Sequence, residues 1–221
     1  MFPLKDTEPT YSTPVVTIAL IAVNLLVFIF EASLGERTRN LFIETYGLVP
    51  DYFRFRAILT SMFLHGGWLH VLGNMWFLWI FGDNVEDLLG HGKFLLFYLL
   101  CGVAAALGQV LTNPFSTVPM VGASGAIAGV MGAYMIKFPR ARVLTLVFIL
   151  IFITTLEIPA PIMLAYWFVI QLFSGIGSIS THMSQGGVAF FAHVAGFISG
   201  IVLIKVLGTR ERYSRRRSDY Y

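Results

Sequence analysis

Long stretches without a charged side chain constrain this chain more than any other feature of its sequence. Residues 15–30 contain no Asp, Glu, Lys or Arg, and similar stretches recur along the chain. A helix needs about 20 apolar residues to cross the hydrocarbon core of a bilayer. Only 12% of the 221 residues are charged, about half the share in a soluble domain. Too little polar surface remains to cover a water-soluble globule, so we expect a membrane protein with several spans.

The apolar stretches predict six membrane-spanning helices in an all-α bundle. We expect one membrane core (residues 14–207) between a cytoplasmic N-terminal segment (1–13) and a basic cytoplasmic tail (208–221). Several stretches are shorter than a full crossing, so some helices are expected to begin below the membrane surface. The predicted spans are residues 15–30, 69–81, 93–111, 123–137, 161–173 and 188–207.

Residues 143–156 are apolar and rich in β-branched side chains, and they would form a seventh span if they crossed. The distribution of Lys and Arg separates the two topologies, because cytoplasmic loops carry an excess of both. Six spans with a cytoplasmic N-terminus place 11 of them inside and 4 outside, whereas seven spans place 5 inside and 10 outside. Six spans are therefore predicted, with both termini cytoplasmic. Residues 143–156 are then a buried or interfacial element whose conformation the sequence does not decide.

The basic residues are concentrated at the C-terminal end of the chain. Six Lys and Arg residues lie between positions 205 and 217, which is typical of a tail against anionic lipid. We therefore expect the lipid bilayer, and no nucleic acid, as a partner. The single cysteine, Cys101, excludes an intramolecular disulfide. No cleavable signal is evident before the first span, and a prokaryotic plasma membrane is expected.

Polar side chains inside the predicted spans need an explanation, because an unpaired polar group in a membrane is unfavourable. His70 and Asn74 are four residues apart and share one helix face, with Gly73 between them and His65 at the helix entrance. Hydrogen bonding between helices is the simpler explanation of this pair. A functional site is the alternative, and the pair alone does not separate the two.

Two predicted spans carry matching stripes of small residues, each beginning with a polar side chain. Small residues allow two helix backbones to approach closely, so we expect these spans to pack directly. The leading serine and histidine then lie at similar depth below the same outer surface. The stripes are Ser124, Ala128 and Gly132 in one span, and His193, Gly196 and Gly200 in the other.

Ser124, in the stretch VGASGAIAG, has three possible explanations: a packing residue, the start of a helix, or a nucleophile. A packing serine accounts for the glycines but not for a histidine at equal depth. A nucleophile accounts for both, because a neutral imidazole can take the hydroxyl proton as general base. No acidic residue is placed to complete a triad, so a Ser124–His193 dyad is predicted. His70, Asn74 and the backbone N–H of Ser124 would then donate to the oxyanion.

At these residues the chain resembles the rhomboid family of intramembrane serine proteases. The resemblance extends from about residue 56 to residue 200 and implies a six-helix fold with Ser124 as nucleophile and His193 as base. It also implies that His70 and Asn74 help to form the oxyanion hole. Supporting roles fall to His65, Gly122, Gly125, Gly196 and Gly200. The resemblance is carried by GASG (122–125), HGGWLHVLGN (65–74), HVAGFISG (193–200) and FGDNVEDLLGHGKF (81–94), with Glu86 at the family's glutamate.

Two positions depart from the family pattern. Some members have a tyrosine four residues after the serine that stacks on the catalytic histidine, and here that residue is Ala128. We expect Phe190 or Phe191 to support His193 instead. Phe55-Arg56 stands where members often have Trp-Arg.

The remaining polar and aromatic residues are given simpler roles. Neither a metal nor another cofactor is expected, since no HExxH motif occurs and no acidic ligand lies near the histidines. The other expectations are a solvated His91, an outer-loop His182, helix-packing roles for Asn24 and Gln171, and packing or lipid-facing positions for Tyr166, Trp167 and Phe168.

Together these features predict a serine endopeptidase that cuts peptide bonds in or near transmembrane segments of membrane protein substrates. A substrate helix must unwind first, so weak helix formers are expected near the cleaved bond. A catalytically silent relative that binds membrane clients is the alternative, although such a protein would normally lack the serine or the histidine. A transporter would show charged residues within spans or paired half-repeats, and we find neither in the sequence.

Overall fold

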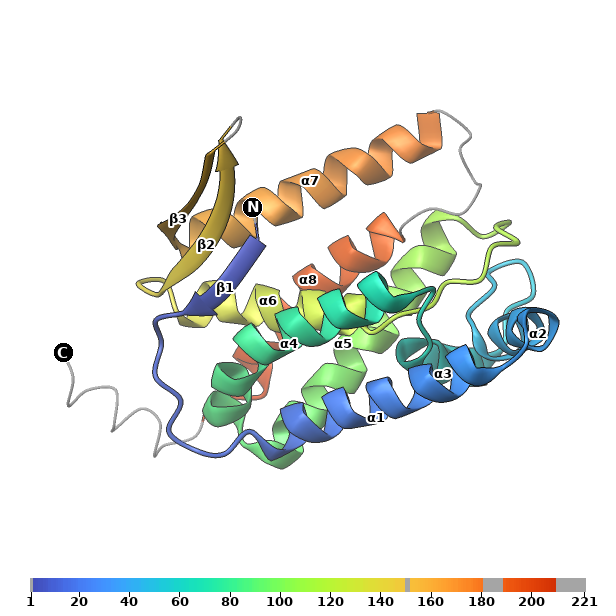
Figure 1. Ribbon diagram of the computed structural model, residues 1–221, viewed down its shortest axis with the longest axis horizontal. Coiled ribbons are helices and arrows are strands. Elements are labelled where there is room, and N and C mark those ends of the chain that lie inside the picture. The colour runs from blue at the N-terminus through green and yellow to red at the C-terminus, as the bar shows by residue number, and fades with distance from the viewer. Residues whose placement is uncertain (1, 150–151, 181–188, 210–221) are drawn as a thin grey trace.

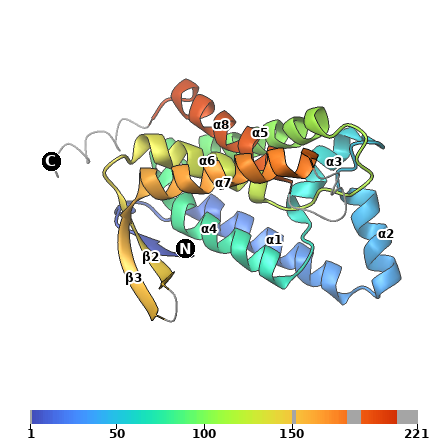
Figure 2. The ribbon, with the colours of Figure 1, turned by 90° about the horizontal axis from the view of Figure 1, so that it is seen from above.

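Long helices run side by side through most of the chain, and a small sheet closes one end of their bundle (Figures 1 and 2). The computed structural model describes residues 2–149, 152–180 and 189–209. We call the two ends of the bundle the sheet end, where β1–β3 lie, and the serine end, where α6 begins. The helices are α1 (Val15–Ser33), α2 (Glu36–Tyr46), α3 (Phe55–Thr60), α4 (Trp68–Leu89), α5 (His91–Thr112), α6 (Ser124–Lys137), α7 (Ala160–Ser180) and α8 (Phe190–Val206), and the strands are β1 (Phe2–Asp6), β2 (Arg142–Ile149) and β3 (Phe152–Pro159).

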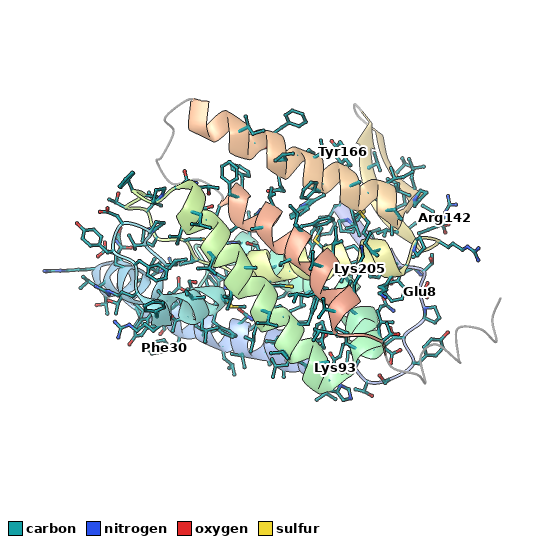
Figure 3. The ribbon with its side chains drawn as sticks, turned by 180° about the vertical axis from the view of Figure 1, so that it is seen from behind. Glu8, Phe30, Lys93, Arg142, Tyr166 and Lys205 are labelled. Atoms are coloured by element: carbon teal, nitrogen blue, oxygen red, sulfur yellow. The ribbon has the colours of Figure 1, made fainter. Side chains whose placement is uncertain are left out.

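Each of the six predicted spans overlaps a helix, namely α1, α4, α5, α6, α7 or α8. Within the described residues, three helices are long and apolar enough to cross a membrane: α1, α5 and residues Ala160–Gly177 of α7. α8 is apolar but shorter, and α6 has only 14 residues. Apolar side chains are exposed along the outer helices; Phe30 and Tyr166, labelled in Figure 3, are each more than half exposed on α1 and α7. The chain is an integral membrane protein.

Helix α6 lies at the centre of the bundle, with every residue from Gly125 to Tyr134 buried. It packs closely on α8 because glycines face carbonyl groups across the contact. A Cβ atom on Gly196 would lie 2.0 Å from the Gly125 oxygen, and one on Gly200 would lie 1.9 Å from the Gly129 oxygen. Gly125 and Gly129, which the predicted stripe left out, meet the α8 glycines. Gly132 of that stripe also contacts α8, since a Cβ atom there would lie 2.3 Å from the Phe197 oxygen.

Glu86 joins the start of α1 to the end of α4. Its carboxylate accepts hydrogen bonds from the backbone N–H groups of Val16 (2.8 Å) and Thr17 (2.7 Å). These N–H groups lack intrahelical partners, because they belong to the first turn of α1. The start of a helix also attracts negative charge, and α1 has no side-chain cap of its own. Glu86 therefore caps α1 from a neighbouring helix.

Residues 143–149 and 152–156 lie in two antiparallel strands, β2 and β3, and β1 pairs with β2 to complete a three-stranded sheet. Val143 pairs with Ile158 and Thr145 with Leu156. β-Branched side chains fit a pleated strand better than a helix. The all-α prediction was therefore incomplete, and the N-terminal segment contributes a strand. Contacts of β1 with α4, and of β2 and β3 with α7, place the sheet between these two helices.

Candidate active site

Ser124 is the first residue of α6 and follows a turn that only glycine adopts readily. Gly122 has φ of +123°, a conformation that side-chain-bearing residues rarely adopt. Its N–H donates to the Ser61 carbonyl at 2.8 Å, which fixes the turn against the segment before α4. The N–H groups in the first turn of a helix have no intrahelical acceptor. The backbone N–H of Ser124 is therefore a free donor beside the hydroxyl.

His193 lies in the first turn of α8, and its ring faces Ser124. The distance from His193 Nε2 to Ser124 Oγ is 2.8 Å. Both residues lie in the first turn of their helices at the serine end, and the Gly196–Gly125 contact holds the two helices at backbone distance. The structure thus brings the two predicted dyad residues within hydrogen-bonding distance, and His193 is only 7% exposed.

The side chains that support His193 come from α7. The Oε1 atom of Gln171 lies 2.7 Å from His193 Nδ1, and the Trp167 ring lies 5.6 Å from the imidazole centroid at an interplanar angle of 41°. The aromatic ring that packs on His193 is Trp167 rather than the expected Phe190 or Phe191. Gln171 connects α7 to α8 as a helix-packing residue would, and its partner on α8 is His193. Trp167 and Gln171 are four residues apart and share a helix face, a spacing in the sequence that could have revealed them as a pair.

His70 and Asn74 lie across the turn from the dyad. A Cβ atom on Gly122 would be 2.8 Å from His70 Nε2 and 3.5 Å from Asn74 Nδ2, so both groups lie against this glycine. Gly66 N–H donates to His70 Nδ1 at 3.4 Å, which leaves the ring proton on Nε2. The Nδ2 atom of Asn74 is buried and has no hydrogen-bond partner among the described residues. Two donors are therefore available beside Ser124.

A cavity of about 780 Å³ joins these groups. Its wall includes Ser124 and His193 on one side and the α4 residues His70 and Asn74 on another. Apolar side chains, including Phe77 of α4 and Trp167 of α7, line the rest. A pocket with an apolar wall and a few converging polar groups is typical of a binding site. The cavity gives an extended peptide segment room beside the serine.

His65 lies behind His70, with the two ring centroids 5.1 Å apart in an edge-on arrangement. Burial lowers the pKa of His65 to about 3, so its ring is uncharged. Glu31, a buried residue at the end of α1, accepts the His65 backbone N–H at 3.1 Å and contacts Arg39 Nε at 3.3 Å. Arg39 also donates to the Gly66 carbonyl at 3.4 Å. The ion pair between Glu31 and Arg39 was not predicted from the sequence. Its only signal there is Glu31, a lone acidic residue that ends an apolar stretch.

The other histidines lie outside this cluster. His91, expected to be solvated, is partly exposed, but its Nδ1 atom lies 2.6 Å from Glu86. His182 falls outside the described residues. Among residues 2–149, 152–180 and 189–209, no group of three or more His, Cys, Asp or Glu side chains is arranged to hold a metal ion.

Comparison with known proteins gives a consistent family match. A model described as the Rhomboid domain matches residues 52–210. The rhomboid protease GluP of Bacillus subtilis is 32% identical over 126 residues, which are 55% of this chain and 24% of that protein. The putative rhomboid protease YdcA of the same organism is 36% identical over 124 residues, 55% of this chain and 61% of that protein.

Organellar proteins match as well. Rhomboid-like protein 11, chloroplastic, of Arabidopsis thaliana is 28% identical over 193 residues, 85% of this chain and 64% of that protein. The match therefore spans from about a quarter to less than two thirds of these relatives. Since bacterial and chloroplastic proteins both match, the similarity does not favour the expected prokaryotic membrane over an organellar one.

Proposed function

The chain belongs to the rhomboid family, and from this premise we propose that it is an active intramembrane serine endopeptidase. Its substrates are membrane proteins, cut in or near a transmembrane segment. The observation that carries the proposal is the 2.8 Å contact between Ser124 Oγ and His193 Nε2 in the wall of a cavity with two further donors.

The proposed reaction begins with attack of Ser124 Oγ on the scissile carbonyl carbon while His193 Nε2 takes the hydroxyl proton. The oxyanion that forms accepts hydrogen bonds from His70 Nε2–H, Asn74 Nδ2–H and the Ser124 N–H. His193 then gives its proton to the leaving amine, and the acyl-enzyme remains. Water, deprotonated by His193, attacks the ester and releases Ser124.

The proposed substrate enters the cavity between α4 and α7, which both contribute side chains to its lining. A substrate helix hides its carbonyl groups in hydrogen bonds, so it must unwind before Ser124 can reach one. We expect Gly, Pro or another weak helix former near the cleaved bond. We also propose that the chain crosses the membrane six times with both termini in the cytoplasm. In the substrate, a small residue should stand just before the cleaved bond.

Activity of the purified protein tests the proposal. Wild type in detergent should cut a model single-span substrate and react with a fluorophosphonate at Ser124. Ser124→Ala and His193→Ala should abolish cleavage. Ser199→Ala is the matched control, because the Ser199 hydroxyl donates to the Gly196 carbonyl one turn away on α8 and is not among the residues that line the cavity.

Cleavage that persists in both dyad variants refutes the proposal. A folded wild type that neither reacts with the probe nor cuts a panel of single-span substrates also refutes it, and then favours a silent protein that binds membrane clients.

A further inference from the structure

Gln171 is the residue through which α7 contacts the dyad. Its Oε1 atom lies 2.7 Å from His193 Nδ1, on the side of the ring opposite Ser124. One helix turn earlier, Trp167 packs against the same ring. The nucleophile, the base and the residue behind the base therefore come from three helices, α6, α8 and α7.

The amide oxygen determines which imidazole nitrogen can act as base. An oxygen facing Nδ1 accepts a hydrogen bond, so the ring proton stays on Nδ1 and the lone pair of Nε2 points at the Ser124 hydroxyl. Without this acceptor the proton can move to Nε2, where the imidazole donates to Ser124 and cannot deprotonate it. A neutral amide does this without burying the unpaired charge that a carboxylate would bring.

Helix α7 is also the least enclosed of the three candidate spans. Within an apolar stretch of 18 residues, 22% of α7 is buried inside the protein, against 28% of α1 and 39% of α5. It packs on α6, α8 and the sheet, and it forms one side of the cavity. Near the serine end, buried Gly175 packs against α8: a Cβ atom there would lie 3.2 Å from Phe190 Cβ and 3.3 Å from Phe191 Cζ. The position of α7 on α8 therefore fixes the position of Gln171.

From this geometry we infer that Gln171 is a positioning residue that makes His193 a base only while α7 is packed on α8. Displacement of α7, as when a substrate enters beside it, removes the acceptor from Nδ1. Return of α7 restores the acceptor, so proton transfer from Ser124 follows closure of the cavity. The inference rests on the proposed protease function and adds a condition for its chemical step.

Two substitutions of Gln171 test the positioning role. Gln171→Met keeps the length of the side chain but has no acceptor, and it should lower kcat by about 10–100-fold, as loss of an outer partner of a functional imidazole does. KM, expressed as a mole fraction in detergent, should change less than twofold. Gln171→Glu keeps an acceptor oxygen and should restore kcat to within about fivefold of wild type.

These variants separate a catalytic effect from a structural one. A merely structural role predicts that a buried carboxylate harms the protein at least as much as methionine does. The inference is overturned if the methionine variant keeps kcat within twofold of wild type, or if the glutamate variant loses as much as the methionine variant. A wild type that cuts nothing refutes the protease proposal itself, whereas an active wild type with an equally active Gln171→Met refutes only this inference.

A wedge between α7 and α8 tests the dependence on helix position. Gly175→Leu must push α7 away from Phe190 and Phe191, and it should lower kcat about as much as Gln171→Met. The double variant should be no slower than either single variant, because both changes remove the same contact. Gly177→Leu is the matched control, since a Cβ atom there meets no atom of the described residues within 4 Å. The link to α7 is overturned if the two losses of kcat multiply in the double variant. It is also overturned if Gly177→Leu lowers kcat as much as Gly175→Leu does.

Discussion

The carboxylates at the sheet end of α4 and the polar groups around Ser124 differ in how fully they are hydrogen-bonded. At the sheet end, the acidic side chains are supplied with donors from the segment before α1 and from its first turn. Around Ser124, the buried polar groups keep hydrogen-bonding capacity unused, and Asn74 Nδ2 has no partner among the described residues. The sheet-end bonds are Thr10 to Asp83 (2.6 Å), Tyr11 N–H and Ser12 to Asp87 (2.9 and 2.5 Å), and Val16 and Thr17 N–H to Glu86 (2.8 and 2.7 Å).

Under the proposed function, this difference separates polar groups that stabilise the fold from polar groups that would bind a substrate. A buried donor without a partner destabilises a folded protein by about 1–3 kcal/mol, so it persists where something else uses it. A saturated carboxylate has no capacity left for a reacting group. The comparison predicts that substitutions at the serine end lower activity and that substitutions at the sheet end lower stability.

The largest expected effect is on activity and compares two asparagines of α4. Asn74→Leu should lower kcat/KM by about 10²–10³-fold, the usual effect of losing one oxyanion donor, with the unfolding midpoint unchanged or higher. Asn84→Leu should do the reverse, because Asn84 hydrogen-bonds the N-terminal segment. Its unfolding midpoint should fall while the activity per folded molecule stays within twofold. Cleavage rates and thermal unfolding in one detergent measure kcat/KM and the unfolding midpoint of each variant. The comparison is contradicted if the two variants change both quantities alike.

The next effect is on stability at the sheet end. Glu86→Gln should lower the free energy of unfolding by about 1–3 kcal/mol, because a neutral amide cannot accept both N–H groups of α1 as strongly as the carboxylate does. Glu44→Gln, on the exposed face of α2, is the control and should change nothing measurable. Reversible unfolding in mixed micelles gives both values. A loss of kcat without a loss of stability in Glu86→Gln contradicts the assignment.

The pH dependence of stability is a smaller effect at the same end. Burial, with a contribution from the nearby Asp83 carboxylate, raises the pKa of Asp6 from 3.8 to about 7. Between these values the folded protein holds a proton that the unfolded chain has released, so stability falls as the pH rises from about 4 to about 7. Partial exposure keeps the slope below the ~1.4 kcal/mol per pH unit of one fully coupled proton. Asp6→Asn should flatten the slope in this range; an unchanged slope assigns it to another group.

The smallest effect concerns the ion pair beneath the His65–Gly66 turn. Arg39→Gln should lower kcat by no more than about fivefold, because the pair is partly exposed and positions His70 only through Gly66. Arg37→Gln, on the exposed side of the same helix, is the control. A loss as large as that of Asn74→Leu would make Arg39 a direct part of the site.

How far the sequence predicted this structure depended on whether the information was local. The Ser124–His193 contact was predicted because two short stripes and their depths specify it. Gly125 and Gly129, which also face α8, were left out of the predicted stripe, since a period of 3.6 leaves a helix rotation uncertain by about one position.

The unpredicted elements depend on partners far apart in the chain. β2 pairs with a strand about 140 residues earlier, and no pattern within residues 143–156 indicates it. Gln171 reaches His193 only because α7 returns across α8, so its contact was invisible until the helices were arranged in space.

The shortness of α6 affects how the protein sits in a lipid bilayer. At about 1.5 Å per residue, its 14 residues cover about 21 Å of a hydrocarbon layer that is about 30 Å thick. Because neighbouring helices surround it, this mismatch becomes an internal well instead of a dent in the lipid. In the proposed protease, Ser124 would stand at the floor of that well, where hydrolytic water and a helical substrate would meet at a fixed depth. Membrane thickness thus becomes a determinant of which bond along a substrate is presented.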